Sequence, residues 1–101
     1  MLAAILRTAR SAPVDMRKWR WVIDNRMCMY GEMDPNKYVV RINIEKHRRE
    51  RASLIDTLVH EELHILFPRL GEAMICALTE RRLRSMSKLE KGRLYARIRR
   101  R

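Results

Sequence analysis

The residues best placed for chemistry lie in one short segment, residues 57–64, which reads Thr-Leu-Val-His-Glu-Glu-Leu-His. His60, Glu61 and His64 form the pattern His-Glu-x-x-His. On an α-helix, two residues four apart lie about one turn apart and about 40° from each other around the axis. Two imidazoles at that spacing can bind one tetrahedral zinc ion, and Glu61 on the same side can hold a zinc-bound water without being a ligand. The pattern predicts a zinc-binding helix.

A helical projection of the surrounding residues supports this interpretation. With His60 at 0° and about 100° per residue, the apolar residues fall on a broad face between about 120° and about 300°. The polar arc between about 0° and about 100° holds Ser53, Thr57, His60, Glu61 and His64. The helix can therefore bury one side and present both histidines and Glu61 to a common cleft. Glu62, at about 200°, points away from the zinc and is not a catalytic candidate.

A catalytic zinc usually has three protein ligands and keeps one position for water. Glu72 is the candidate for the third, because the turn after Pro68 folds the chain back and its helical neighbours are mostly apolar, where a carboxylate is costly unless a cation compensates it. The alternative is a glutamate that only stabilises a helix N-terminus. Glu80 is the reserve candidate and His47 a weaker one. Cys76 is either a soft ligand or a core residue.

The elements that must position these residues can be read from the hydrophobic pattern. Strands are expected over residues 19–23, 27–33 and 38–44, the second and third joined as an antiparallel hairpin by Asp34-Pro35-Asn36. Helical periodicity then runs over residues 46–67 and stops at Pro68. Further helices are expected over residues 72–86, with Gly71 as N-cap, and from Ser87 into the basic terminus. A short helix is also expected over residues 1–10.

These elements predict an α+β fold: a small antiparallel sheet of about three strands packed on the metal helix, followed by one or two further helices. The length of 101 residues is that of one domain, which we place over residues 1–86, with residues 87–101 as a basic C-terminal helix or tail. Two cysteines, Cys28 and Cys76, are too few for a disulfide framework and are expected to be buried thiols in a reducing compartment. No apolar run is long enough to span a membrane, so we expect a soluble, cytoplasmic protein.

The charge is concentrated at the C-terminus. The net charge is +11, yet residues 1–80 hold 13 Lys/Arg and 11 Asp/Glu, whereas residues 81–101 hold ten Lys/Arg and only one acid, Glu90. Such a segment is either a binding surface for nucleic acid or another polyanion, or a solvated helix that keeps a small protein soluble. The candidate nucleic-acid contacts are Arg97, Arg99, Arg100 and Arg101.

Several segments together resemble one family. Tyr30-Gly31-Glu32, the strand of residues 38–44, residues 57–64 and Pro68-x-x-x-Glu72 are similar to the minimal zincin metallopeptidases, small single-domain relatives of the gluzincins met in phages, other mobile elements and prokaryotes. The resemblance covers about residues 19–85. It implies that His60, His64 and Glu72 bind zinc, that Glu61 is the general base, and that a strand within residues 27–33 lines the cleft and accepts an extended peptide.

The sequence departs from that family at two positions, and it leaves little chain to form a lower subdomain that would close the cleft. Gly71 stands where a serine-like cap is expected, and no Tyr or His that could stabilise the oxyanion follows Glu72 except Tyr95, so Tyr30 and Arg69 are named as substitutes. The basic tail also resembles that of the DNA-associated SprT-like proteases. We therefore expect a zinc metallopeptidase of weak or narrow activity acting on peptides or proteins in the cytoplasm, that of the host if phage-encoded. The alternative is a non-catalytic, zinc-stabilised domain that binds nucleic acid through its tail.

Overall fold

The computed structural model describes residues 14–99, the side chain of Arg99 excepted. Its elements are the 3-10 helix η1 (Met16–Lys18), the strands β1 (Arg20–Ile23), β2 (Gly31–Asp34) and β3 (Val39–Ile42), and the helices α2 (Ile44–Glu50), α3 (Leu54–Leu66), α4 (Glu72–Ser85) and α5 (Lys88–Arg99). The α+β class is confirmed. The helix expected over residues 1–10 lies outside the described residues, as do Arg100 and Arg101.

The sheet is mixed, so the expectation of a purely antiparallel sheet is wrong. The hairpin of β2 and β3 is confirmed, with Gly31 opposite Ile42. However, the strand order is β1-β3-β2, and β1 runs parallel to β3. The chain leaves β1, crosses to the far edge for β2 and returns through the centre. β3 takes that centre because Val40 and Ile42, on one face of the strand, are fully buried.

The second and third strands are shorter than expected. β2 begins at Gly31, and the preceding residues 27–30 form a bend that Asn43 holds. The Asn43 backbone N–H donates to the Tyr30 carbonyl oxygen at 2.9 Å, and its side-chain Nδ2 donates to the Met27 carbonyl oxygen at 2.8 Å. Asn43 also ends β3, because its Oδ1 accepts from the Lys46 backbone N–H at 2.9 Å and caps α2.

The expected helix over residues 46–67 is in fact two helices. Arg51 has a φ of 55°, in the left-handed region, and closes α2. Two residues later, the Ser53 hydroxyl accepts a hydrogen bond from the Asp56 backbone N–H at 3.2 Å and starts α3. The apolar period runs through this break, so periodicity alone could not reveal it. The break gives α2 and α3 separate directions.

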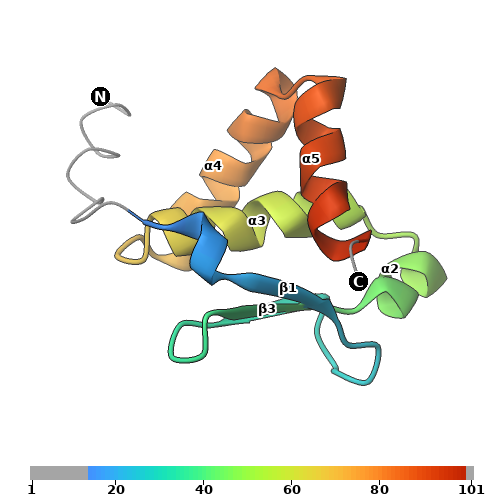
Figure 1. Ribbon diagram of the computed structural model, residues 1–101. Coiled ribbons are helices and arrows are strands. Elements are labelled where there is room, and N and C mark those ends of the chain that lie inside the picture. Colours follow the sequence, from blue (N-terminus) through green and yellow to red (C-terminus); the bar gives the residue numbers. More distant parts are fainter. Residues whose placement is uncertain (1–13, 100–101) are drawn as a thin grey trace.

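Helix α3 lies at the centre of the molecule. The helices α3, α4 and α5 lie on one side of the sheet, as Figure 1 shows, and α3 packs against β2, α4 and α5. Its Leu58 and Val59 are fully buried beside Val40 and Ile42 of β3. The helix that carries the His-Glu-x-x-His pattern is thus held from three directions.

The helices α4 and α5 agree with the expected ranges. Ser87 caps α5 reciprocally, because its hydroxyl accepts from the Glu90 backbone N–H while Glu90 accepts from the Ser87 backbone N–H. Leu94 and Ile98 of α5 are buried in the same core as α3. The described part of the basic C-terminal segment is therefore a folded helix that packs against α3 and β1.

Both cysteines are exposed, so the expectation of buried thiols is wrong. Cys28 lies in the bend between β1 and β2, and Cys76 lies on α4, where it lines an open pocket together with His60. Over residues 14–99, no helix is both long enough and apolar enough to cross a bilayer.

Candidate metal centre

The three predicted ligands come together in the structure. Nε2 of His60 lies 3.1 Å from Nε2 of His64, 2.8 Å separate His60 Nε2 from Glu72 Oε2, and 3.0 Å separate His64 Nε2 from Glu72 Oε1. All three groups offer a ligand atom within 4.8 Å of the others. In the described part of the chain this is the one cluster of three or more His, Cys, Asp or Glu side chains with that geometry. The cluster can hold a metal ion.

Local structure explains this convergence. The two histidines are one turn apart on α3, which ends when the Phe67 backbone N–H donates to the Leu63 carbonyl oxygen at 2.8 Å. The chain then turns through residues 67–71, and α4 begins at once with Glu72 in its first turn. Since α4 packs directly on α3, the first turn of one helix faces the last turns of the other.

The chemistry of this donor set fits a divalent cation. Two imidazole nitrogens and a carboxylate converge, and no lysine or arginine of the described residues forms an ion pair with Glu72. Burial raises the pKa of Glu72, but the nearby His60 and His64 outweigh it, so the pKa of this carboxyl is lowered. It is therefore ionised and ready to act as a ligand. Two nitrogens and one carboxylate oxygen are the ligand set of several catalytic zinc sites.

Glu61 lies beside the cluster in a different environment. Only 7% of the residue is exposed, although its neighbours are on a solvent-facing arc. Burial raises the pKa of Glu61 to about 7, with further contributions from the negative charges of Glu72 and Glu32. A carboxylate with a pKa near neutrality can both accept and return a proton at physiological pH. Its position and pKa suit it to be a general base rather than a ligand.

An open pocket joins Glu61 to His60, one of the three candidate ligands. It has a volume of about 310 Å³ and is formed between the start of β2 and the N-terminal half of α3. Its lining residues are Met29, Tyr30, Gly31, Asp56, Thr57, His60 and Glu61. A second pocket of about 390 Å³ shares Asp56 and His60 with the first and extends along α4. His60 therefore borders both pockets, and Glu61 only the first.

Gly31 is a site residue that sequence reasoning missed. A Cβ at this position would lie 2.8 Å from Thr57 Cγ2 and 3.3 Å from Glu61 Oε2. Thr57 cannot easily move aside, because its Oγ1 is hydrogen-bonded to Nε2 of the buried His47 at 2.7 Å. The available signal was a glycine inside the expected strand over residues 27–33, which often marks a close approach of two backbones.

The reserve ligands lie outside the cluster. His47 is 4% exposed and both its ring nitrogens are occupied, Nδ1 donating to the Asn43 carbonyl oxygen at 2.6 Å. Glu80 lines the second pocket and pairs with Arg84 at 3.6 Å. Cys76 is exposed rather than a core residue, and its thiol lies 3.7 Å from Glu72 Oε2.

The two oxyanion candidates are also placed. Tyr30 lines the pocket of Glu61, but its hydroxyl donates to Glu50 on α2. Arg69 is exposed in the loop between α3 and α4 and lines neither pocket that His60 borders. Among the described residues, neither Tyr30 nor Arg69 forms a hydrogen bond or ion pair with His60, His64 or Glu72.

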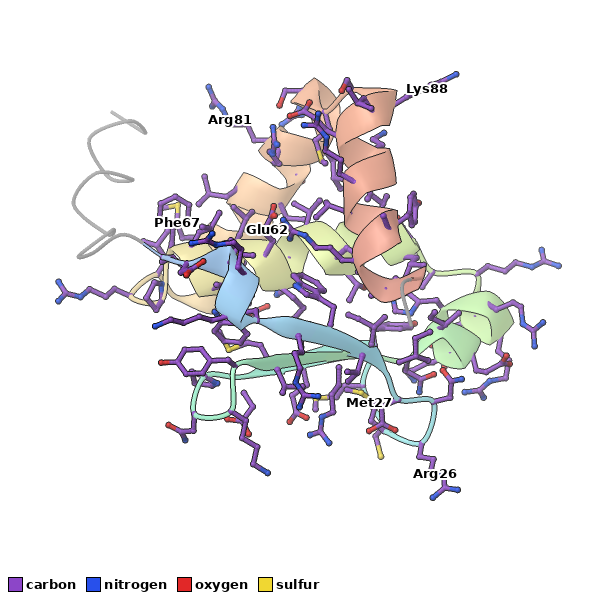
Figure 2. All side chains as sticks on the ribbon, viewed as in Figure 1. Arg26, Met27, Glu62, Phe67, Arg81 and Lys88 are labelled. Atoms are coloured by element: carbon purple, nitrogen blue, oxygen red, sulfur yellow. The ribbon has the colours of Figure 1, made fainter. Side chains whose placement is uncertain are left out.

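Arg97, a candidate nucleic-acid contact, is held inside the fold. Its guanidinium donates to Glu62 on α3 at 2.8 Å and lies over the Trp21 ring at 5.3 Å. This pair accounts for the orientation of Glu62, which faces away from the metal-binding cluster as the projection predicted. Figure 2 shows Glu62 between α3 and α5.

Glu61 should make the metal-free protein less stable as the pH rises. Its folded pKa of about 7 lies above its ordinary value of 4.5, so the folded state binds the proton more tightly than the unfolded state. This stabilisation is complete below about pH 4.5 and is lost as the pH rises through about 7, by up to about 3 kcal/mol. Urea denaturation in a chelator between pH 5 and pH 8 should show a steeper fall for wild type than for Glu61→Gln. Parallel curves would contradict the prediction.

Gly31→Ala should destabilise the protein by about 1–3 kcal/mol, because the new methyl group overlaps Thr57 Cγ2. Gly92→Ala is the matched control, since a Cβ at Gly92 meets nothing within 4 Å and alanine favours a helix interior. The control should be more stable than wild type by up to about 1 kcal/mol. Urea denaturation measures the stability of both variants. An unchanged midpoint for Gly31→Ala would show that β2 can shift to accommodate the methyl group at little cost.

Comparison of the chain with protein-family models, with curated proteins and with solved structures gives no match.

Proposed function

We propose that this protein is a zinc-dependent metallopeptidase of the minimal zincin type. The observation that carries the proposal is the convergence of His60, His64 and Glu72 on one point, with Glu61 buried beside them in an open pocket. A structural ion would need no general base and no adjoining pocket. Three protein ligands leave a tetrahedral ion one further position, as in catalytic zinc sites.

The chain's own residues supply most of what peptide hydrolysis requires. Zinc, when bound, supplies a Lewis acid for a carbonyl oxygen and lowers the pKa of a coordinated water. Glu61 accepts a proton from the attacking water and returns it to the nitrogen of the departing amine, so that one water is consumed for each peptide bond broken. The burial that raises the pKa of Glu61 to about 7 makes both transfers accessible near neutral pH.

The edge of the sheet offers a place for an extended peptide. β2 is an edge strand, because β3 pairs with it on one side only. It begins at Gly31, where an added Cβ would lie 3.3 Å from Glu61 Oε2, and Gly31 and Glu61 line the same pocket. A peptide that adds to the free edge of β2 would therefore pass the general base, and its own backbone would complete the hydrogen bonds of that edge. The substrate class is an unfolded segment or a flexible peptide.

The alternative is a zinc ion that only stabilises the fold. One observation favours it: the exposed thiol of Cys76 lies 3.7 Å from Glu72 Oε2, close enough to be a fourth ligand after a small movement. X-ray absorption spectroscopy of the zinc-loaded protein distinguishes the two. A first shell of nitrogen and oxygen only supports the catalytic site, whereas a zinc–sulfur distance of about 2.3 Å indicates a closed, structural site.

The activity itself is tested with a library of internally quenched peptides and the zinc-loaded protein. Cleavage that a chelator abolishes and added zinc restores is the expected result. If the spectroscopy shows an open site and no peptide is cleaved at any zinc concentration, the metallopeptidase proposal fails even though the metal site stands.

A further inference from the structure

The end of α4 and the whole of α5 carry a positive charge that the rest of the fold balances only in part. Between residues 81 and 99 there are eight basic residues and one acid, Glu90. Of the seven whose side chains the structure describes, three form ion pairs: Arg82 with Glu90, Arg84 with Glu80, and Arg97 with Glu62.

Three basic side chains of α5 are left without such a partner. Lys88, Lys91 and Arg93 form no side-chain hydrogen bond or ion pair with any residue between 14 and 99. Lys88 and Arg93 are exposed, and Lys91 is half-buried. Figure 2 shows Lys88 extending away from the body at the start of α5. We call these three residues the basic surface of α5.

Lys88 and Arg93 lie on the exposed side of a well-anchored helix, and Lys91 lies at the edge of its buried face. Leu94 and Ile98 face the core, where α5 packs on α3 and β1. At about 100° per residue, Lys88 and Lys91 fall on one flank of the helix and Arg93 on the opposite flank. The ridge between the flanks consists of Leu89, Gly92 and Ala96, and a Cβ at Gly92 would meet nothing within 4 Å. Small and apolar residues thus separate Lys88 and Lys91 on one flank from Arg93 on the other.

We propose that α5 binds the sugar-phosphate backbone of nucleic acid through Lys88, Lys91 and Arg93. An α-helix is about 10–12 Å wide, similar to the width of about 12 Å of the major groove of B-form DNA, so cations on its two flanks can reach phosphates on both sides of a groove. Arg97 is not part of this surface, because Glu62 and the Trp21 ring hold it within the fold. Binding of this kind is electrostatic and independent of sequence.

The test compares two triple variants of the full-length, zinc-loaded protein. Lys88→Gln/Lys91→Gln/Arg93→Gln removes the basic surface. The matched control, Arg26→Gln/Lys37→Gln/Arg49→Gln, lowers the net charge by the same amount at three exposed positions elsewhere. Circular dichroism and thermal unfolding establish that both variants are folded. Fluorescence anisotropy of a short labelled DNA duplex then measures the dissociation constant between about 50 mM and about 200 mM salt.

Wild type should show a slope of about −3 in a plot of log binding constant against log salt concentration, one counterion being released for each phosphate contact. The α5 variant should lose nearly all of that slope and bind about 10- to 100-fold more weakly at about 50 mM salt, while the control stays close to wild type. Equal losses in the two variants would mean that only net charge matters and would overturn the proposal. Binding to heparin without binding to either duplex or single-stranded DNA would also overturn it.

Discussion

Zinc-loaded Glu61→Gln protein should cleave peptides about 10²- to 10⁴-fold more slowly than wild type and still bind zinc with the same affinity. Glutamine has nearly the shape of glutamate, so it can occupy the same buried position against Gly31, but it cannot accept the proton of the attacking water. The cluster of His60, His64 and Glu72 does not include Glu61, which is why metal binding should survive. The turnover number and the zinc content are measured on the same preparation.

Glu62→Gln is the matched control for that experiment. It makes the same chemical change one residue along α3, at a side chain that pairs with Arg97 instead of lining the pocket of Glu61. The control should retain full activity per bound zinc. Full activity of Glu61→Gln would remove the general base from the proposed mechanism, and equal losses in both variants would point to damage to α3 rather than to lost proton transfer.

Glu72→Gln should weaken zinc binding by about 100-fold or more, because an amide oxygen is a much poorer zinc ligand than a carboxylate. At a fixed excess of free zinc, such a loss removes about 2.7 kcal/mol of zinc-dependent stabilisation. The dissociation constant is measured by competition with a chromophoric chelator, and the stabilisation by urea denaturation with and without zinc. Both measurements should give the same ranking of variants.

Glu80→Gln provides the comparison. Glu80 lies on the same helix, two turns after Glu72, and lines the second pocket together with His60. It lies outside the cluster, so its affinity for zinc should equal that of wild type. The opposite ranking, with zinc lost in Glu80→Gln and kept in Glu72→Gln, would identify Glu80 rather than Glu72 as the third ligand. Equal affinities in all three proteins would show that the histidines bind zinc without a carboxylate from α4.

The cluster of His60, His64 and Glu72 was predictable because its geometry is largely local. His60 and His64 are on one helix, so their separation follows from the helical repeat alone. Glu72 follows after a short turn that Pro68 imposes, which leaves α4 little choice but to fold back along α3. The ranges of α4 and α5 were predictable for a similar reason, because Gly71 and Ser87 are local boundary signals.

The arrangement of the sheet and the surroundings of Glu61 were not predictable in this way. Whether β1 runs parallel or antiparallel to its neighbour depends on which strand takes the central position, and that depends on contacts between segments far apart in the chain. The exposure of both cysteines likewise depends on which side of an element meets a partner. Arg97 carries the same charge as Lys88, yet only the proximity of Glu62 and Trp21 places it within the fold.

The amino-acid sequence by itself determined the donor atoms, their order along the chain and the α+β class, since these depend on residue type and on interactions within a few residues. Only the tertiary structure decided that Gly31 approaches Glu61, that this carboxyl is buried enough for its pKa to rise to about 7, and that three cations on α5 have no ion-pair partner among the described residues. The physical reason is that desolvation and charge pairing depend on every group within a few ångströms. Those groups come from segments far apart in the chain.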